Sequence, residues 1–349
     1  MFDPKSLLRP HLRNLVPYSS ARDEYSGREG VFLDANENSL GSAIDTAYQR
    51  YPDPYQRELK AKIAEIKGVE ADHIFLGNGS DEPIDLLYRA FCEPDQDNVI
   101  ITPPTYGMYE VSAGIHNVEV LKVNLTVDFH LKADEILATA NSCTKIIWLC
   151  SPNNPTGNLI DKADIEKIIK SFDGIVVVDE AYIDFADQPS MTGVLDRYPN
   201  LVVLHTFSKA WGMAGLRLGA AFASREIVAI LNLIKAPYNL SQATQLIALE
   251  AMNNESQVKQ MVAVIIRLRR ELAEQLSSLS QVEHIYPSDA NFLLVRFREA
   301  QKVFDYLIAQ KIIVRNRRKV VLCDEGLRIT VGTREENLRL IDTLKNMPS

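Results

Sequence analysis

The sequence predicts an α/β fold: a large domain with a mostly parallel central sheet flanked by helices, followed by a smaller α/β domain. Three observations support this prediction. Five short apolar runs lie between residues 73 and 206, and each leads into a polar or glycine-containing turn. The runs are apolar throughout rather than alternating, which is typical of strands buried on both faces of a sheet. Segments with helical periodicity separate several of the runs, and such crossovers join parallel strands.

The elements of the large domain follow in chain order. The expected strands are HIFLG (73–77), NVIIT (98–102), KIIWLC (145–150), IVVVDE (175–180) and LVVLHT (201–206). Helical spacing of apolar residues predicts helices over 82–91 and 162–171. Each of these helices lies between two strands, as the parallel arrangement requires.

The pattern changes after residue 238. Apolar residues at helical spacing predict a long amphipathic helix over 257–279 and a shorter helix over 301–310. Strands are expected at 291–297, 311–316 and 326–332. This mixture predicts the second, smaller α/β domain.

These elements divide the chain into three parts. The first residues are rich in proline, asparagine and charge, so we expect an N-terminal arm over 1–44, associated with the small domain. Residues 45–240 form the expected large domain, and residues 241–349 form the expected small C-terminal domain.

Composition excludes several classes of function. The net charge is −8, which disfavours a nucleic acid or an anionic membrane as partner. No apolar run approaches the about 20 residues that span a bilayer, and no signal sequence is apparent, so we expect a cytoplasmic protein. The four cysteines show no C-x-x-C spacing and the six histidines are scattered, so no metal site is expected.

Ligands of open α/β sheets bind at the carboxyl ends of the strands, so candidate ligand-binding residues are expected there. After the first strand, GNGSDEP (77–83) combines two glycines with an acidic helix start. Free N–H groups at such a start suit a phosphate, although an ordinary glycine-rich turn has the same composition. The third glycine of a dinucleotide-binding motif is missing, which argues against a nicotinamide dehydrogenase.

Polar residues follow three further strands. Asn154 lies in the turn SPNNPTG, and Asp179 ends IVVVD. Lys209, flanked by Ser208 and followed by Arg217, comes after the last run. Taken singly, these residues are also consistent with a turn, a solvated rim carboxylate and a solvent-facing lysine. Together they supply a nucleophilic amine, an acid for a pyridinium nitrogen, an amide for a ring oxygen and anion sites, as pyridoxal phosphate requires.

At this point the chain resembles a known family, the fold-type I pyridoxal-phosphate-dependent aminotransferases, and among them the histidinol-phosphate aminotransferases. The resemblance runs nearly end to end. The motifs that carry it are LDANEN (33–38), RYPDP (50–54), GNGSDE (77–82), PPTYGMY (103–109), SPNNPTG (151–157), VVDEAYIDF (177–185), TFSKAWGMAGLRLG (206–219) and GLRITVGTREEN (326–337). The resemblance implies the fold of this transferase class and pyridoxal 5′-phosphate as cofactor.

The family pattern also implies roles for matching residues. Lys209 would bind the cofactor covalently, Asp179 would pair with the pyridinium nitrogen, and Asn154 and Tyr182 would bind the ring's phenolic oxygen. Lys209, Asp179 and Tyr182 are the expected catalytic residues. Tyr106 would lie against the ring.

The cofactor phosphate would be held by one group of residues, which are Ser208, Arg217, Gly79, Ser80 and Asp81. Tyr51 of RYPDP would reach the same site from a neighbouring subunit, so the resemblance implies a homodimer.

The implied reaction converts L-histidinol phosphate and 2-oxoglutarate into imidazole-acetol phosphate and L-glutamate, a step of histidine biosynthesis. Arg315 and Arg328 match the family's anion-binding arginines, and the expected substrate contacts also include Tyr18, Asn154 and Tyr106. We expect the neighbouring Arg317, Arg318 and Lys319 to form a solvated basic loop. Two alternatives share the fold: an aminotransferase for aromatic amino acids, and an enzyme like the phosphothreonine decarboxylases.

Overall fold

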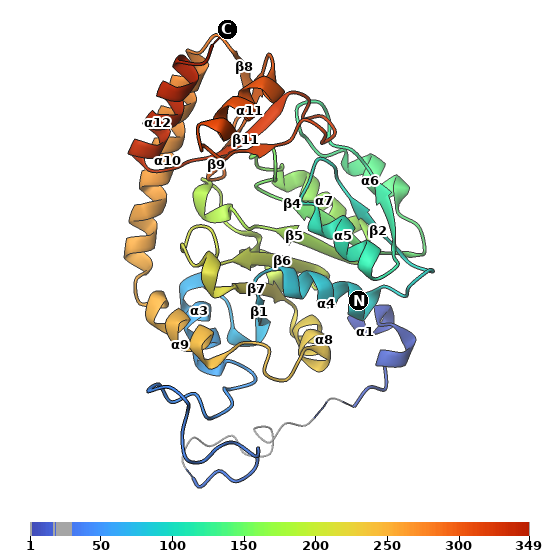
Figure 1. Cartoon of the computed structure of the whole chain (residues 1–349). Helices are drawn as coiled ribbons and strands as arrows, with labels where there is room; N and C mark the ends of the chain where they lie inside the picture. Colours follow the sequence, from blue (N-terminus) through green and yellow to red (C-terminus); the bar gives the residue numbers. More distant parts are fainter. Residues whose placement is uncertain (1, 17, 19–29, 349) are drawn as a thin grey trace.

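The computed structural model describes residues 2–16, 18 and 30–348, and Figure 1 shows the arrangement of its elements. A seven-stranded sheet forms the centre of the larger part. Its strand order is β1 (Ile74–Asn78), β7 (Leu218–Ala223), β6 (Leu201–Thr206), β5 (Ile175–Asp179), β4 (Thr144–Cys150), β2 (Asn98–Ile101), β3 (Glu119–Lys122). The strand β7 runs opposite to the other six strands, so the predicted mostly parallel sheet is confirmed.

The five strands predicted from apolar runs are present within about one or two residues at each end. The sequence did not predict β3 or β7. The strand β7 reads LGAAFA, and glycine and alanine have low strand propensity. The edge strand β3 reads EVLK and is partly exposed, so it lacks a continuous apolar run.

Helices cover both faces of the large sheet. On one face lie α3 (Arg57–Lys67), α6 (Ala133–Thr139) and α7 (Lys162–Ser171), and on the other lie α4 (Asp81–Phe91), α5 (Met108–Ile115) and α8 (Arg225–Ile234). Successive residues of β5 face opposite cores: Val176 and Val178 pack on the first face, Ile175 and Val177 on the second. This double burial explains why the strand is apolar throughout.

The start of the chain corrects one expectation. The short helix α1 (Pro4–Leu7) and the turn η1 (Pro10–Leu12) pack against the large part, not the small domain, because Leu8 and Leu12 are buried with residues of α4 and α8. The Arg9 N–H donates to the Ala90 carbonyl at 3.0 Å. Residues 30–56 are irregular apart from isolated turns and bends.

The smaller part contains an antiparallel sheet in the order β10 (Arg315–Asn316), β11 (Gly326–Thr330), β9 (Phe292–Phe297), β8 (Val282–Ile285). The helices α10 (Glu255–Ser277), α11 (Ala300–Ala309) and α12 (Arg334–Lys345) share one core with it. The helices predicted at 257–279 and 301–310 are confirmed. The strand predicted over 311–316 is wrong except for its last two residues, because Lys311 turns at a positive φ of 59° after α11.

Two helices connect the parts. The helix α9 (Gln242–Met252) buries Ala248 and Met252 in a core shared with the large sheet, and the long α10 leads from there to the second sheet (Figure 1). The division between residues 240 and 241 stays a prediction. Within the described ranges, no helix combines the length and the apolar character needed to cross a bilayer.

Candidate active site

The carboxyl ends of three adjacent strands, β4, β5 and β6, open into one cavity of about 140 Å³. Nearly all of the predicted cofactor residues line it. The lining includes Ser80, Asp81, Tyr106, Asn154, Asp179, Tyr182, Ser208, Lys209 and Arg217. Residues separated by more than a hundred positions are therefore brought together at the edge where open α/β sheets bind ligands.

Asp179, the last residue of β5, is 2% exposed. One carboxylate oxygen accepts the Ala181 N–H at 3.1 Å, and the other accepts the Tyr109 hydroxyl at 2.6 Å. Burial raises the pKa of Asp179 from 3.8 to about 6, against the two donors, which lower it. Within the described part of the chain Asp179 forms no ion pair. A buried carboxylate of this kind is stabilised by a cation that enters the cavity, such as a protonated pyridine nitrogen.

Tyr109 was missed by the sequence analysis. It lies in the predicted motif PPTYGMY, three residues after Tyr106, near the start of α5. Its side chain is fully buried, and its ring stacks on Trp148 of β4 with centroids 4.9 Å apart. A signal existed in the motif, but nothing in one sequence distinguishes a tyrosine that bonds Asp179 from one that only fills the core.

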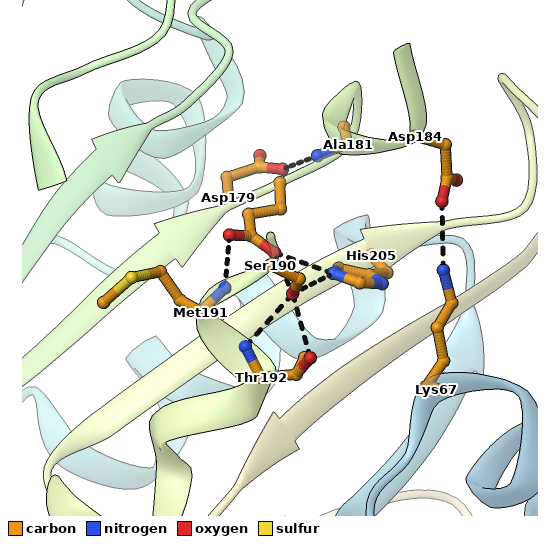
Figure 2. Close-up of polar contacts among 9 residues, drawn as sticks. Lys67, Asp179, Ala181, Asp184, Ser190, Met191, Thr192 and His205 are labelled. Atoms are coloured by element: carbon orange, nitrogen blue, oxygen red, sulfur yellow. Dashed lines mark hydrogen bonds and ion pairs between the residues drawn. The ribbon is translucent and has the colours of Figure 1, made fainter. Parts of the chain in front are cut away.

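The residue after Asp179 anchors the end of β5 from the opposite face of the sheet. The buried Glu180 accepts the Met191 N–H at 2.8 Å and pairs with His205 Nε2 at 2.9 Å. The Ser190 hydroxyl also donates to Glu180 and accepts the Thr192 N–H, and Figure 2 shows Ser190, Thr192 and His205 close together. The network fixes the backbone that carries Asp179.

Lys209 lines the cavity with its Nζ 5.8 Å from the centre of the Tyr182 ring. Burial lowers the pKa of Lys209, and the nearby cations Arg328 and Arg217 lower it further. A lowered pKa increases the fraction of neutral amine, which is the nucleophilic form. The position therefore fits covalent binding of a carbonyl group.

Asn154 and Tyr182 face each other across the cavity. The Asn154 side-chain amide donates to the Tyr182 hydroxyl at 3.5 Å, and its oxygen accepts from Arg328 Nη1 at 2.5 Å. Arg328 also lies over the Phe292 ring at 5.1 Å. This contact links the cavity to β11 of the smaller part.

The other end of the cavity is an anion site. Arg217, in the left-handed conformation at φ 53°, directs one guanidinium nitrogen to Ser208 Oγ at 3.2 Å and the other to Asp81 at 3.4 Å. Ser80 begins α4 without a side-chain cap, so N–H groups of the first turn remain available to an anion.

Two glycines make this anion site possible. A Cβ at Gly79, where φ is 71°, would lie 2.5 Å from Arg217 Nη2, and a Cβ at Gly219 would overlap the Gly79–Ser80 backbone. The residues present thus fit a phosphorylated pyridine aldehyde: an amine, a carboxylate at the strand end and an anion site. The fit rests on this donor set and on the unpaired buried carboxylate.

A wider cavity of about 820 Å³ adjoins Tyr106 and Asn154 and is lined by Arg315 and Arg317. Arg315 is the register partner of Arg328, so the two side chains share one face of the small sheet. Arg317 corrects an expectation in part: the residue is partly buried, and its Nε is buried without a hydrogen-bond partner among the described residues. Burial lowers the pKa of Arg317 most, and the positive charges of Arg328 and Arg315 lower it further.

Three residues, Arg318, Tyr51 and Tyr18, lie outside these two cavities. Arg318 pairs with Glu325 at 2.9 Å, away from these cavities. Tyr51 is half-exposed and stacks on Tyr238, with centroids 4.5 Å apart, in a different pocket. Tyr18 is 74% exposed and lines none of these pockets. The structure therefore does not bring Tyr51 or Tyr18 to the site of their own chain.

Comparison with known proteins adds independent information. A family model described as aminotransferase class I and II matches residues 25–344. A histidinol-phosphate aminotransferase of Cytophaga hutchinsonii is 57% identical over 344 residues, which is 99% of this chain and 99% of that protein. One from Parabacteroides distasonis is 53% identical over 347 residues, again 99% of each chain.

The fold is similar to that of a solved structure. The histidinol-phosphate aminotransferase of Sinorhizobium meliloti, in complex with pyridoxal-5′-phosphate, matches with a TM-score of 0.78 and 20% identity. The match covers 97% of this chain and 98% of that one.

Proposed function

Because the chain belongs to the class I and II aminotransferase family, we propose that it transfers the amino group of L-histidinol phosphate to 2-oxoglutarate, with pyridoxal 5′-phosphate as cofactor. The products are imidazole-acetol phosphate and L-glutamate, as in histidine biosynthesis. The relatives that are more than half identical over nearly the whole chain carry the name of this activity. The structural observation that supports it is that Lys209 and Asp179, from neighbouring strand ends, line one cavity.

The cofactor, when bound, accepts the electron pair released from the substrate's Cα–H bond. Lys209 would bind the cofactor, and its amine, once displaced by the substrate, would take the Cα proton. General acid–base catalysis of this kind contributes about 10²–10⁴-fold. Asp179 would hold the proton on the ring nitrogen, because a buried carboxylate favours a cationic partner.

The remaining cavity residues would bind and orient. Asn154 and Tyr182 would hold the ring's phenolic oxygen, Tyr106 would cover the ring, and Arg217 with Ser208 would hold the cofactor phosphate together with the Gly79–Asp81 turn. The Tyr106 hydroxyl donates to Asp81 at 3.1 Å, which fixes both side chains. Backbone N–H groups, not the Asp81 carboxylate, would contact the phosphate, because like charges repel.

Substrate anions would be bound by the small part. Arg315 and Arg328 lie on one face of the sheet, and neither forms an ion pair with a carboxylate of the described residues. Arg315 is exposed and Arg328 is partly buried, and a guanidinium without a carboxylate partner favours a phosphate or carboxylate ligand. We assign both the histidinol phosphate and the 2-oxoglutarate anions to this pair, at the junction of the proposed large domain (45–240) and small domain (241–349).

The protein would act as a homodimer in the cytoplasm. The segment 30–51 exposes four large aliphatic side chains, and α9 exposes two more; they are Val31, Leu33, Leu40, Ile44, Leu246 and Ile247. Surface of this kind is typical of a protein interface. Tyr51, half-exposed on the same segment, would reach the cofactor of the partner subunit.

Two rival functions remain within the same fold. An aminotransferase for aromatic amino acids would use the same cofactor residues but would not require a phosphate on the substrate. A decarboxylase acting on phosphothreonine would release carbon dioxide. Both are tested by the experiment that tests the main proposal.

The experiment uses purified protein loaded with pyridoxal phosphate. Histidinol phosphate and 2-oxoglutarate are added, glutamate formation is followed, and phenylalanine replaces histidinol phosphate in a parallel reaction. The proposal predicts glutamate from histidinol phosphate at a kcat/KM well above that for phenylalanine. Preference for phenylalanine supports the first rival, and carbon dioxide from phosphothreonine without glutamate supports the second.

A further inference from the structure

We propose that Tyr109 is a positioning residue of this reaction, whose hydroxyl holds the Asp179 carboxylate in the orientation and charge state that a protonated ring nitrogen requires. The inference rests on the proposed function, since it concerns the same cofactor. Its basis is the 2.6 Å hydrogen bond from the Tyr109 hydroxyl to Asp179 Oδ2, between two side chains that are almost completely buried.

Two ring contacts position the Tyr109 side chain. Its ring stacks on Trp148 with an interplanar angle of 14°, and it meets the Tyr106 ring edge-on, with centroids 5.6 Å apart. The Tyr88 ring also stacks on Trp148, and the Tyr88 hydroxyl donates to the Tyr109 carbonyl at 2.7 Å. The ring contacts hold the Tyr109 side chain so that its hydroxyl reaches Asp179 before any cofactor binds.

Two hydrogen bonds hold the Asp179 carboxylate in one orientation. Oδ1 accepts the Ala181 N–H and Oδ2 accepts the Tyr109 hydroxyl, which leaves the remaining lone pairs for a ligand in the cavity. Both donors are neutral. They stabilise the negative charge without neutralising it, and among the described residues no cation forms an ion pair with this carboxylate, so a cationic ligand nitrogen would supply that pair.

The hydrogen bond also decides where a shared proton resides. Without the Tyr109 donor, the buried Asp179 would be a stronger base and would draw the proton from the ring nitrogen to itself. A neutral ring accepts the substrate's electron pair less well, so turnover would fall even though the cofactor still binds. Tyr109 thus acts through Asp179 and does not touch the substrate.

The test compares two isosteric variants. Tyr109→Phe keeps the ring in the stack and removes the hydroxyl that bonds Asp179. Tyr88→Phe removes a buried hydroxyl from the same stack, at a position that has no contact with Asp179. The readout is the affinity of the cofactor-free protein for pyridoxal phosphate, measured by absorbance between pH 5 and pH 8. Near-ultraviolet circular dichroism verifies that both variants retain the packed core.

Several titratable groups face Asp179, and all are common to the parent and both variants apart from the substituted tyrosine. They are Asp81, Tyr106, Cys150, Glu180, Tyr182 and Lys209. The difference between the curves therefore isolates the missing hydroxyl. Hydrogen bonds to charged groups are strong enough that losing one moves a midpoint by about one to two pH units.

We expect the acid midpoint of cofactor affinity to rise by about one pH unit or more in Tyr109→Phe and to stay at the parent value in Tyr88→Phe. In the loaded enzyme, kcat should fall about tenfold or more in Tyr109→Phe with KM nearly unchanged. Coincident midpoints for Tyr109→Phe and the parent would overturn the inference and leave the proposed function intact, as would an equal rise in Tyr88→Phe. A parent protein that binds no pyridoxal phosphate would overturn the proposed function itself, and the role of Tyr109 with it.

Discussion

Replacing Asp179 by asparagine should affect the stability of the cofactor-free protein and the turnover of the loaded enzyme in opposite directions. In the cofactor-free protein the carboxylate is 2% exposed and has no cationic partner among the described residues. Its pKa rises from 3.8 to about 6 on folding. The difference corresponds to about 3 kcal/mol of destabilisation once the group is ionised in the folded state.

The sign of this effect follows from the direction of the pKa change. Below pH 3.8 the group is protonated in both the folded and the unfolded chain and costs nothing. Between pH 3.8 and about 6 the unfolded chain loses its proton first, so the free energy of unfolding falls as the pH rises. Above about pH 6 the full destabilisation is present.

Asparagine removes the ionisation and keeps the shape, and the Tyr109 hydroxyl can accept from the new amide. We therefore expect the cofactor-free Asp179→Asn variant to be more stable than the parent by about 2–3 kcal/mol at pH 8. The advantage should shrink by about 1–2 kcal/mol at pH 5. Urea unfolding of both proteins at the two pH values measures the difference. The exposed Asp187→Asn is the control and should show no pH-dependent gain.

The loaded enzyme should respond in the opposite way. Removing one partner of a buried ion pair costs about 3–5 kcal/mol, which converts to a loss of kcat of roughly 100- to 5,000-fold. Steady-state glutamate formation at saturating substrate gives this number. A variant that is both destabilised at pH 8 and within about threefold of parental kcat would refute the assignment of Asp179 as a buried carboxylate awaiting a cation.

Four further predictions concern other parts of the site. Lys209→Ala should abolish turnover and the absorption band of the protein-bound cofactor; residual turnover near the parental rate would exclude a role for the amine. Arg315→Ala should lower kcat/KM for histidinol phosphate about 10- to 100-fold with cofactor affinity unchanged, whereas Arg318→Ala, which removes contacts with Glu325 and Gln301 outside the cavities, should change neither. Mixing inactive Lys209→Ala with impaired Tyr51→Phe should restore activity if Tyr51 acts across a dimer, and should not if it acts within its own chain. Gly219→Ala should weaken pyridoxal phosphate binding about tenfold or more in equilibrium titration, because its Cβ overlaps the Gly79–Ser80 backbone; unchanged binding would show that the anion site tolerates displacement.

The sheet was predictable where its strands are buried on both faces. The runs ending at Cys150, Asp179 and Thr206 are continuous and apolar, and the residues that follow them are the ones that line the cavity. The strand β7 was not predictable from its composition, because alanine and glycine at these positions serve close packing against β1 and the Gly79 turn. The strand propensity of single residues does not reflect this packing requirement, because the residues packed against β7 are distant in the sequence.

Single-residue environments were predicted less well than the site as a whole. Arg317 was grouped with its exposed neighbours because a run of basic residues has the same composition whether it is solvated or buried. The alternation of side chains after β10 decides the outcome, directing Arg317 inward and Arg318 to Glu325. Residues 2–12 pack on α4 and α8 because Leu8 and Leu12 are buried against them. These helices are distant in the sequence, so local pattern does not indicate the contact.

The most direct test of the shared cavity is to trap the cofactor on the protein. Borohydride reduction of the protein loaded with pyridoxal phosphate, followed by proteolysis and mass spectrometry, locates the residue that becomes labelled. We predict label on the peptide that contains Lys209, and a marked loss of label from the Asp179→Asn variant at low cofactor concentration. Label confined to other lysines, or a labelling of Lys209 that is indifferent to Asp179, would contradict the conclusion that these two side chains serve one ligand.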